Sequence, residues 1–207
     1  MKVELLDSMG TDLTVVNAAR VSFAKHAQDF LPKDEKLIKY LADHKHTSPF
    51  GHCFASFRVT APIFVSRQLV KHKFLRINEE SRRYISDEPT FFEPWEWRQK
   101  SEDKKQGSGG PAKSQYFPSV YLQDTQRECL ERYKKMLQQG VCEEQARMVL
   151  PLSTMTTWIW SGSMDAWADM CNLRCKKDAQ YETQIIAQEV DDRLHGVWPI
   201  SWDSLRK

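Results

Sequence analysis

The segment APIFVSRQLVKHKFLRINEESRRY, residues 61–84, constrains this chain most, because an apolar run gives way there to a dense array of charge. The pattern predicts a helix from Ala61 to Phe74, with Pro62 in its first turn, where the missing N–H costs little. Gln68 and His72 are spaced one helical turn apart, so they would share one face of this helix.

After Phe74 the charges no longer follow helical spacing, which favours a loop over a solvated helix face. Five cations fall within thirteen residues, namely Lys71, Lys73, Arg76, Arg82 and Arg83. Arginine forks and lysine point charges suit phosphate groups, so the loop is a candidate anion site. The alternative from residue types alone is a surface loop whose cations pair internally with Glu79 and Glu80.

Composition limits the classes of protein to which this chain can belong. Its 207 residues, 41% hydrophobic and 28% charged, are typical of one soluble globular domain spanning 1–207, or one protomer of an oligomer. A net charge of +2 argues against a general nucleic-acid binder. No apolar stretch approaches the ~20 residues of a membrane span. The first residues, MKVELLDSMG, do not have the pattern of a signal peptide.

Cysteine and histidine usage indicates reduced thiols and no metal. The five cysteines form no CxxC pair, which is typical of a cytoplasmic protein. Three histidines, His44, His46 and His52, lie within nine residues but lack acidic or thiol partners at useful spacing. We therefore expect no metal site and a cytoplasmic location.

Hydrophobic periodicity predicts helices and strands in both halves of the chain. The expected strands are 2–6 and 53–60, the second with Ala55, Phe57 and Val59 on its buried side. The expected helices are 12–20, 34–44, 120–139, 143–150, 164–175 and 178–194. Residues 7–12 are expected to form a turn, 85–96 are irregular, and 152–160 are apolar and aromatic. Residues 100–114, rich in Gly, Ser and Lys, predict a flexible surface loop. The expected class is α+β, with a central sheet flanked by helices.

The central segment also carries a motif. It contains Lys71-His72-Lys73, Asn78-Glu79, Ser81 and Arg83-Tyr84 at fixed spacing. This resembles the signature of the flavin-dependent thymidylate synthases, in which arginines flank the histidine. The resemblance extends to MGTDLTVVNAARVSF, to His46-Thr47-Ser48-Pro49-Phe50, to Ala146-Arg147 before Leu150-Pro151, and to Asn172-Leu173-Arg174.

The resemblance implies the fold of that family and a homotetramer with active sites shared between subunits. It implies reductive methylation of dUMP to dTMP, with FAD as cofactor and methylenetetrahydrofolate and NADPH as co-substrates. The dUMP residues that it implies are Gln68, Lys71, Glu79, Glu80, Ser81, Arg83, Arg147 and Arg174, the last being catalytic. The FAD residues that it implies are His46, Ser48, Lys71, His72, Lys73, Asn78, Glu79, Ser163 and Asp169.

The implied mechanism needs no cysteine nucleophile, because Arg174 would stabilise the pyrimidine ring ionised at N3 and so raise the electron density at C5. Some positions depart from the family pattern. Lysines flank His72, Gly51 stands where glutamate is frequent, and Ser163 and Asp178 stand where asparagine and histidine are frequent.

Three alternatives stay open at this point. A related enzyme with the same cofactors would make 5-hydroxymethyl-dUMP, with water trapping the methylene adduct. A nucleic-acid-binding module would use the basic residues 71–83 and be colourless. A purely structural oligomerisation domain would use none of the signature residues.

Overall fold

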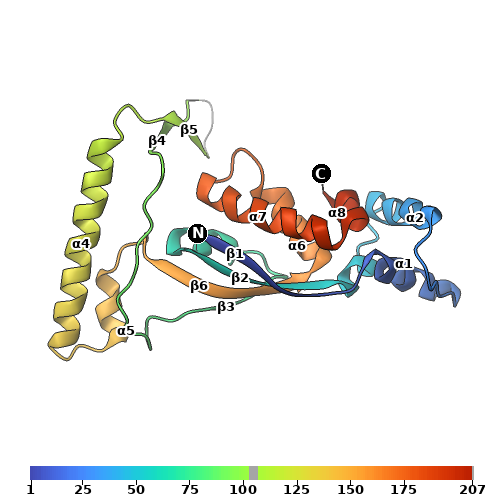
Figure 1. Cartoon of the computed structure of the whole chain (residues 1–207), viewed down its shortest axis with the longest axis horizontal. Helices are drawn as coiled ribbons and strands as arrows, with labels where there is room; N and C mark the ends of the chain where they lie inside the picture. Colours follow the sequence, from blue (N-terminus) through green and yellow to red (C-terminus); the bar gives the residue numbers. More distant parts are fainter. Residues whose placement is uncertain (103–106, 207) are drawn as a thin grey trace.

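Four antiparallel strands form a sheet through the middle of the molecule (Figure 1). The computed structural model describes residues 1–102 and 107–206. The strands are β1 (Lys2–Met9), β2 (Phe54–Pro62), β3 (Arg76–Glu79) and β6 (Met155–Ser163), in the spatial order β1-β2-β6-β3. Helices α6 (Met164–Arg174) and α7 (Tyr181–Val197) cover one face. This arrangement confirms the α+β class.

The remaining elements lie at the two ends of the sheet (Figure 1). One end carries α1 (Asp12–Arg20), α2 (Pro32–Asp43), α8 (Pro199–Leu205) and the 3-10 turns Val21–Phe23 and Ser48–His52. The other end carries α4 (Tyr116–Gln138), α5 (Glu143–Ala146), the 3-10 turn Arg147–Val149 and the paired strands β4 (Arg98–Lys100) and β5 (Ser108–Pro111). Helix α3 (Ile63–Leu69) directly follows β2.

Alternation of buried and exposed residues explains β2 and β6. Ala55, Phe57 and Val59 are buried as the sequence predicts, while Arg58 between them is exposed. On β6, Trp158 and Trp160 are likewise buried around a more exposed Ile159. A period of two with one apolar face is the pattern of a strand that covers a core on one side only.

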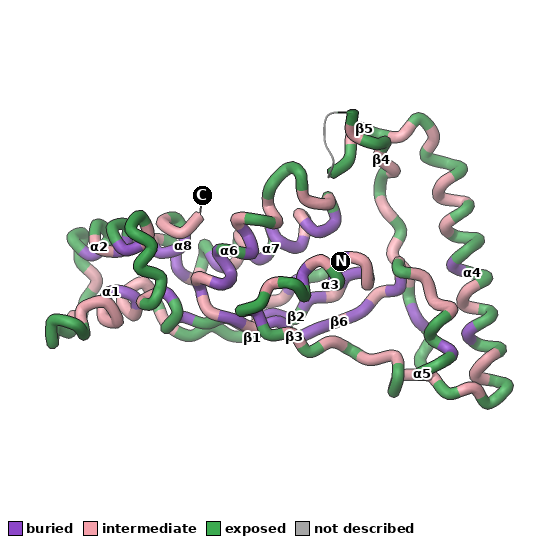
Figure 2. Tube along the Cα trace, turned by 180° about the vertical axis from the view of Figure 1, so that it is seen from behind, coloured by how far each residue is buried: buried purple, intermediate pink, exposed green. Residues whose placement is uncertain are grey.

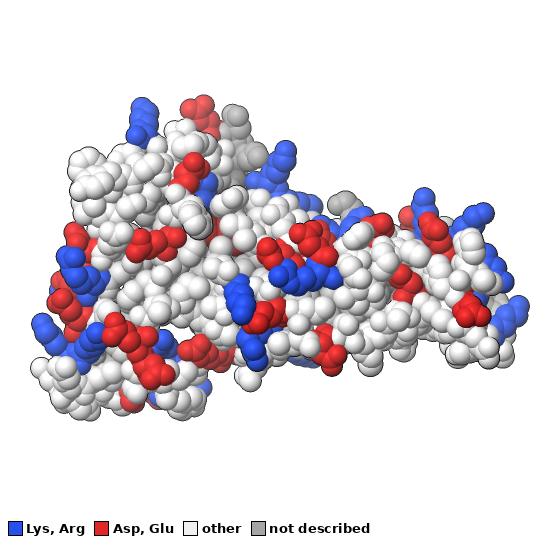
Figure 3. Space-filling model, viewed as in Figure 1, with Lys and Arg blue, Asp and Glu red and all other residues white. Residues whose placement is uncertain are grey.

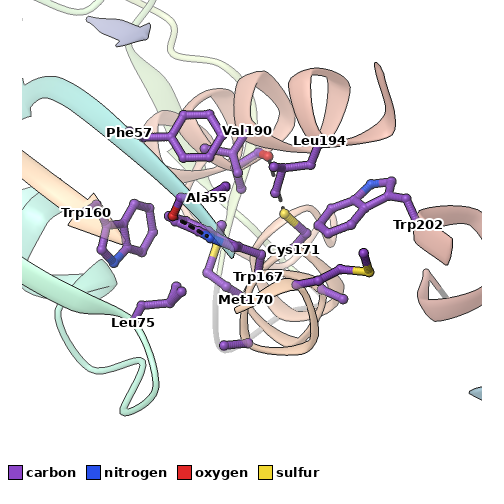
Figure 4. Close-up of a cluster of buried hydrophobic side chains, with 14 of the residues drawn as sticks. Ala55, Phe57, Leu75, Trp160, Trp167, Met170, Cys171, Val190, Leu194 and Trp202 are labelled. Carbon is purple, nitrogen blue, oxygen red and sulfur yellow. Dashed lines mark hydrogen bonds between the residues drawn. The ribbon is translucent and has the colours of Figure 1, made fainter. Parts of the chain in front are cut away.

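Trp167 locks α6 onto the sheet (Figure 4). Its ring meets those of Phe57 and Trp160 edge to face, with centroids 5.0 and 4.8 Å away. Its indole N–H donates to the carbonyls of Ala55 and Gly162, at 3.3 and 3.0 Å. Because a buried indole keeps both its packing and its hydrogen bond here, the register of α6 on the sheet is fixed.

The helix predicted over residues 61–74 is wrong in length. Strand β2 continues to Pro62, and α3 spans only Ile63–Leu69 before a turn. The predicted loop after Phe74 is also wrong, since residues 76–79 form β3. Ile77 pairs with Trp160 of β6 and is half-buried, so the charged run hides a short edge strand.

Gly162 allows the turn before β3 to approach β6. A Cβ at this position would lie 2.3 Å from Leu75 Cδ2 and 3.2 Å from the carbonyl oxygen of Phe74. Only the absence of a side chain permits such proximity. The turn that carries residues 71–75 is therefore held beside the strand that leads into α6.

Several other boundaries differ from those predicted. The apolar segment 152–160 contains most of β6, and the turn expected at 7–12 begins only after β1 ends at Met9. The helix predicted over 143–150 is α5 followed by a 3-10 turn, and α7 begins at Tyr181 rather than 178. The loop predicted over 100–114 contains β5, and its residues 103–106 lie outside the described ranges. Among the described helices, none combines the length and apolar character that a membrane crossing requires.

Candidate active site

An arginine-rich cavity of about 520 Å³ lies where β3 ends. Its lining includes Arg67, Glu79, Glu80, Ser81, Arg82, Arg83, Arg147 and Thr154–Thr156. Five of the residues predicted for dUMP are thereby brought together, although Arg147 is far from the others in sequence. The backbone N–H of Glu80 donates to the carbonyl of Thr157 at 2.8 Å and fixes the start of the loop against β6.

The cavity has more positive than negative charge to offer a ligand. Glu79 accepts a hydrogen bond from Ser66 Oγ at 3.2 Å and lies 3.5 Å from Arg67 Nη1. Arg83 Nε donates to Ser81 Oγ at 3.2 Å, and Arg147 Nε donates to the carbonyl of Glu144 at 3.2 Å. Among the ion pairs of the described residues, neither Arg83 nor Arg147 takes part. Two guanidinium groups thus keep their charge available for a phosphate.

Sequence reasoning missed Arg67 as a cavity residue, and it included Arg82 among the cations of the candidate anion loop but not among the dUMP residues. Arg67 directly precedes Gln68 on α3 and lines the cavity. Arg82 also lines it, and its buried Nε has no hydrogen-bond partner. Arg67 lies one helical turn after Ile63, and both residues line the cavity. The helical spacing puts the two on one face, but only the structure shows that this face borders the cavity. For Arg82 the density of cations in residues 71–83 was the signal, and the motif itself does not include this position.

Arg174 forms a second cluster with Gln68 of α3 and with His72, which lies in the turn after α3. At the C-terminal end of α6, its Nε donates to His72 Nε2 at 3.1 Å and its Nη2 donates to the carbonyl of Gln68 at 3.0 Å. The side-chain amide of Gln68 turns to α7, where it contacts Gln180 and Thr183. None of these residues is part of the lining of the arginine-rich cavity. Within one chain the predicted dUMP residues other than Lys71 therefore form two groups, joined by α3.

Burial and the neighbouring cation keep His72 neutral. Burial of the ring, followed by the positive charge of Arg174, lowers the pKa of His72 to about 4. A neutral imidazole has a ring nitrogen that accepts, which is the role that His72 Nε2 plays toward Arg174. Partial burial also lowers the pKa of Arg174, and the guanidinium stays charged.

Apart from His72, which contacts Arg174, and Glu79, which lines the arginine-rich cavity, the residues predicted for FAD lie in two places. Lys71, Lys73 and Asn78 are exposed on the turn before β3 and on β3 itself. His46 precedes the 3-10 turn Ser48–His52 and Ser48 begins it, and both are exposed. Ser163 is the last residue of β6, and Asp169 lies on the exposed side of α6. Ser163 Oγ donates to Asp165 Oδ1 at 2.5 Å. Leu75 packs on Gly162, so the end of the turn before β3 lies beside the residue that precedes Ser163.

Comparison with known proteins identifies the family. The family described as "Thymidylate synthase complementing protein" matches residues 4–200. A flavin-dependent thymidylate synthase of Thermus thermophilus is 36% identical over 200 residues, which are 97% of this chain and 73% of the relative. The chain belongs to the flavin-dependent thymidylate synthase family.

Other members of the flavin-dependent thymidylate synthase family agree. The enzyme of that name from Kosmotoga olearia is 34% identical over 206 residues, which are 98% of this chain and 88% of the relative. Among solved structures, the UMP/dUMP methylase PolB from Streptomyces cacaoi bound with 5-Br dUMP superposes with a TM-score of 0.89 and 31% identity, covering 98% of this chain and 93% of that one. The expected fold is thus confirmed, and the roles of individual residues stay predictions.

The side chains around the turn before β3 fit a flavin-dependent thymidylate synthase that binds FAD. A dinucleotide presents two phosphates, and no ion pair of the described residues engages Lys71 or Lys73. The hydroxyl of Ser48 and the amide of Asn78, both exposed, supply neutral donors. In the described ranges, no three His, Cys, Asp or Glu side chains lie close enough together to hold a metal ion.

Proposed function

We propose that this chain catalyses the reductive methylation of dUMP to dTMP with methylenetetrahydrofolate, FAD and NADPH, as its family name implies. The observation that carries the proposal is the arrangement around α3. This helix presents Arg67 to the arginine-rich cavity, and the carbonyl of its Gln68 holds Arg174. A phosphate-binding surface and a fixed cation for a base therefore flank one short helix.

Arg83, Arg147 and Ser81 bind the phosphate of dUMP. Arg83 and Arg147 carry charges without carboxylate partners among the described residues, and Ser81 adds a hydroxyl. One guanidinium group can donate to two oxygens of the same phosphate, so Arg83 and Arg147 together fix the orientation of the nucleotide as well as its position. Glu79 and Glu80 limit the positive charge and contact the sugar or the cofactor.

Arg174 polarises the uracil ring. Its guanidinium is held at Nε by neutral His72 and at Nη2 by the Gln68 carbonyl, so it is positioned before the substrate arrives. A fixed cation beside the ring stabilises the form ionised at N3, and the charge in that form raises the electron density at C5. Preorganisation of this kind removes the cost of reorienting the charge during the reaction.

A covalent cysteine is not part of this mechanism. None of the five free cysteines belongs to the lining of the arginine-rich cavity. Burial raises the pKa of the Cys53 thiol to about 12, which leaves it protonated. Five unpaired thiols are also the basis on which we place the protein in a reducing compartment such as the cytoplasm.

FAD, when bound, would provide the hydride and one-carbon chemistry, with NADPH as the source of reducing equivalents. Lys71, Lys73 and Asn78 hold this cofactor from the turn before β3, together with His72 and Glu79. His46, Ser48, Ser163 and Asp169 hold it from the end of the sheet near α1. The part of the protein is to bind and orient the cofactor and the substrates and to exclude water from the site.

Active sites shared within a homotetramer are part of the proposal. The split of the dUMP residues into two groups supports a site completed by another copy. Helix α4 supports it too, since Gln126 and Tyr133 are its only buried residues and the others are half-buried or exposed (Figure 2). Its exposed aromatic residues Tyr116, Phe117 and Tyr121 are suited to packing against a second copy.

UMP is the second candidate substrate, because the similar PolB structure is that of a UMP/dUMP methylase. Nucleic-acid binding has less support. On the face shown in Figure 3, lysines and arginines are interspersed with aspartates and glutamates rather than gathered in one basic surface. The residue departures at Lys71, Ser163 and Asp178 keep 5-hydroxymethyl-dUMP as a possible product.

Product analysis tests the proposal. The FAD-loaded protein is incubated separately with dUMP and UMP, together with methylenetetrahydrofolate and NADPH, and the product is analysed by mass spectrometry. The proposal predicts that dUMP gains one CH₂ unit. A gain of CH₂O identifies the hydroxymethylase, conversion of UMP alone identifies the ribonucleotide as substrate, and no conversion of either refutes the proposal.

A further inference from the structure

A chain of polar side chains joins α7 to Gln68, and the proposed chemistry gives it no role. Gln180 belongs to the Ala179-Gln180 pair that follows Arg174, and Glu182 follows it on the first turn of α7. Helices α3 and α7 pack against each other. The contact between them is therefore polar as well as apolar.

Glu182 is the anchor of this chain. It is 5% exposed, and its Oε1 accepts a hydrogen bond from Arg98 Nη2 at 2.7 Å. Its Oε2 accepts from Gln180 Nε2 at 3.0 Å. A buried carboxylate is an acceptor only, and both of its oxygens are satisfied here.

The orientation of two amides follows from that anchor. Since Gln180 gives its NH₂ group to Glu182, its Oε1 is the atom that accepts from Gln68 Nε2. At the other end, Thr183 Oγ1 donates to Gln68 Oε1 at 3.2 Å. Donors and acceptors thus alternate without conflict from Arg98 to Thr183, and Gln68 has only one orientation that satisfies all of them.

We propose that Glu182 and Gln180 are positioning residues that fix the orientation of the Gln68 amide. Its Nε2 donates to Gln180 Oε1 and to the Phe64 carbonyl, which leaves Oε1 as the atom that can still accept a hydrogen bond from the nucleotide. We call Glu182, Gln180 and Gln68 the amide relay. The inference rests on the proposed function, because the role of Gln68 in holding dUMP is part of it. The relay acts on affinity and not on the chemical step, since Arg174 is held by the backbone carbonyl of Gln68 and not by its amide.

The first test breaks the amide relay in the middle. Titration of dUMP into FAD-loaded Gln180→Leu protein is expected to give a Kd about fivefold higher than wild type, from the net worth of about one hydrogen bond. The turnover number at saturating dUMP is expected to stay unchanged. The matched control is Gln184→Leu on the same helix, whose amide donates to the Ala179 carbonyl at 2.6 Å and does not touch Gln68; this variant is expected to bind dUMP as wild type does.

The second test reverses the polarity and then restores it. In Glu182→Gln, Arg98 holds the new amide by its oxygen, so the NH₂ group faces Gln180 and both following amides must turn over. This variant is expected to bind dUMP more weakly. Adding Gln180→Glu restores an acceptor for Gln68 Nε2 and for the new NH₂ group, so the double variant is expected to recover most of the wild-type affinity. If Glu182 and Gln180 had only a structural role, the double variant would bind dUMP at least as weakly as Glu182→Gln alone.

Thr183→Val is the substitute test if the Glu182 variants do not fold. Valine has nearly the shape of threonine but lacks the hydroxyl that donates to Gln68 Oε1. It too is expected to raise the Kd for dUMP. The inference is overturned if Gln68→Leu weakens dUMP binding while Gln180→Leu and Thr183→Val do not, or if the double variant stays as weak as Glu182→Gln. A wild-type holoprotein that binds no dUMP overturns the proposed function itself, which makes the two failures distinguishable.

Discussion

Arg174 donates from Nε to Nε2 of His72 across 3.1 Å, which requires the imidazole to be neutral. Burial and the adjacent positive charge hold the pKa of His72 at about 4, below its ordinary value of 6.5. The unfolded chain takes up the proton at higher pH than the folded protein does. The neutral ring therefore stabilises the fold fully above pH 6.5, and this contribution is lost as the pH falls from 6.5 toward 4.

Replacing His72 should flatten the acid side of the stability profile. His72→Gln keeps a side chain that can accept from Arg174 and does not titrate. We expect the loss in free energy of unfolding between pH 6.5 and 4 to be smaller in this variant than in wild type, as measured by urea denaturation. Profiles that run parallel over this range would contradict the assigned pKa shift.

Removing Arg174 should abolish turnover and leave the flavin bound. The guanidinium stabilises charge on the ring in the reaction, and losing one preorganised group of this kind costs at least about 10²-fold in rate. The measurement is dTMP formation by Arg174→Ala, with the flavin content read from the visible spectrum. Arg174→Lys is the control, since it keeps the positive charge but not the planar guanidinium with its several donors. Near-normal turnover in Arg174→Ala would overturn the mechanism.

Arg147 should matter for affinity. It lines the arginine-rich cavity and has no carboxylate partner among the described ion pairs. Charge-assisted hydrogen bonds to a phosphate are worth ~1.5–3 kcal/mol, so Arg147→Ala should weaken dUMP binding about 10- to 100-fold and reduce its salt dependence. Arg132→Ala on α4, whose guanidinium pairs with Glu128, is the control and should bind normally. Equal effects in both variants would argue against the site.

Lys71 should act on the cofactor more than on the nucleotide. It is exposed on the turn beside β6 and takes no part in the ion pairs of the described residues. Lys71→Ala is expected to lower FAD retention or folate use, while dUMP affinity changes little. Fluorescence titration with FAD and calorimetry with dUMP separate the two effects, and a loss confined to dUMP would refute this assignment.

Gly162 should tolerate no side chain. A Cβ there would collide with Leu75 Cδ2, and overpacking of this kind costs about 1–3 kcal/mol. Gly162→Ala is thus expected to be less stable in thermal unfolding and to retain less FAD, because the turn carrying residues 71–75 must move. Gly196→Ala is the control, since nothing lies within 4 Å of a Cβ built there. Unchanged stability in Gly162→Ala would mean that Leu75 moves aside freely.

Sequence patterns predicted the elements whose side chains repeat clearly. The alternation around Phe57 identified β2, and the helices near α1 and α6 lie within a few residues of their predicted ranges. Strand β3 was missed because Arg76 and Asn78 face solvent and only Ile77 shows the apolar face. The helix predicted from Ala61 was too long, because the apolar residues at the end of β2 and those of the short helix α3 follow one another without a break in the sequence.

The candidate site was foreseen only where the motif is continuous in sequence. Glu79, Glu80, Ser81, Arg83 and Arg147 were expected to share a ligand, and they line the same cavity. Arg67 and the contacts of Gln180 with Gln68 depend on how α3 packs between β3 and α7, which the motif does not encode. The sequence also does not show that Arg174 lies apart from the arginine-rich cavity, because that separation depends on how the helices pack.

The visible absorption spectrum of the purified protein, before and after addition of dUMP, tests the central claim most directly. The account predicts bound oxidised flavin and a spectral change when dUMP binds beside it. Protein that stays colourless after incubation with FAD and that retains no dUMP would contradict it.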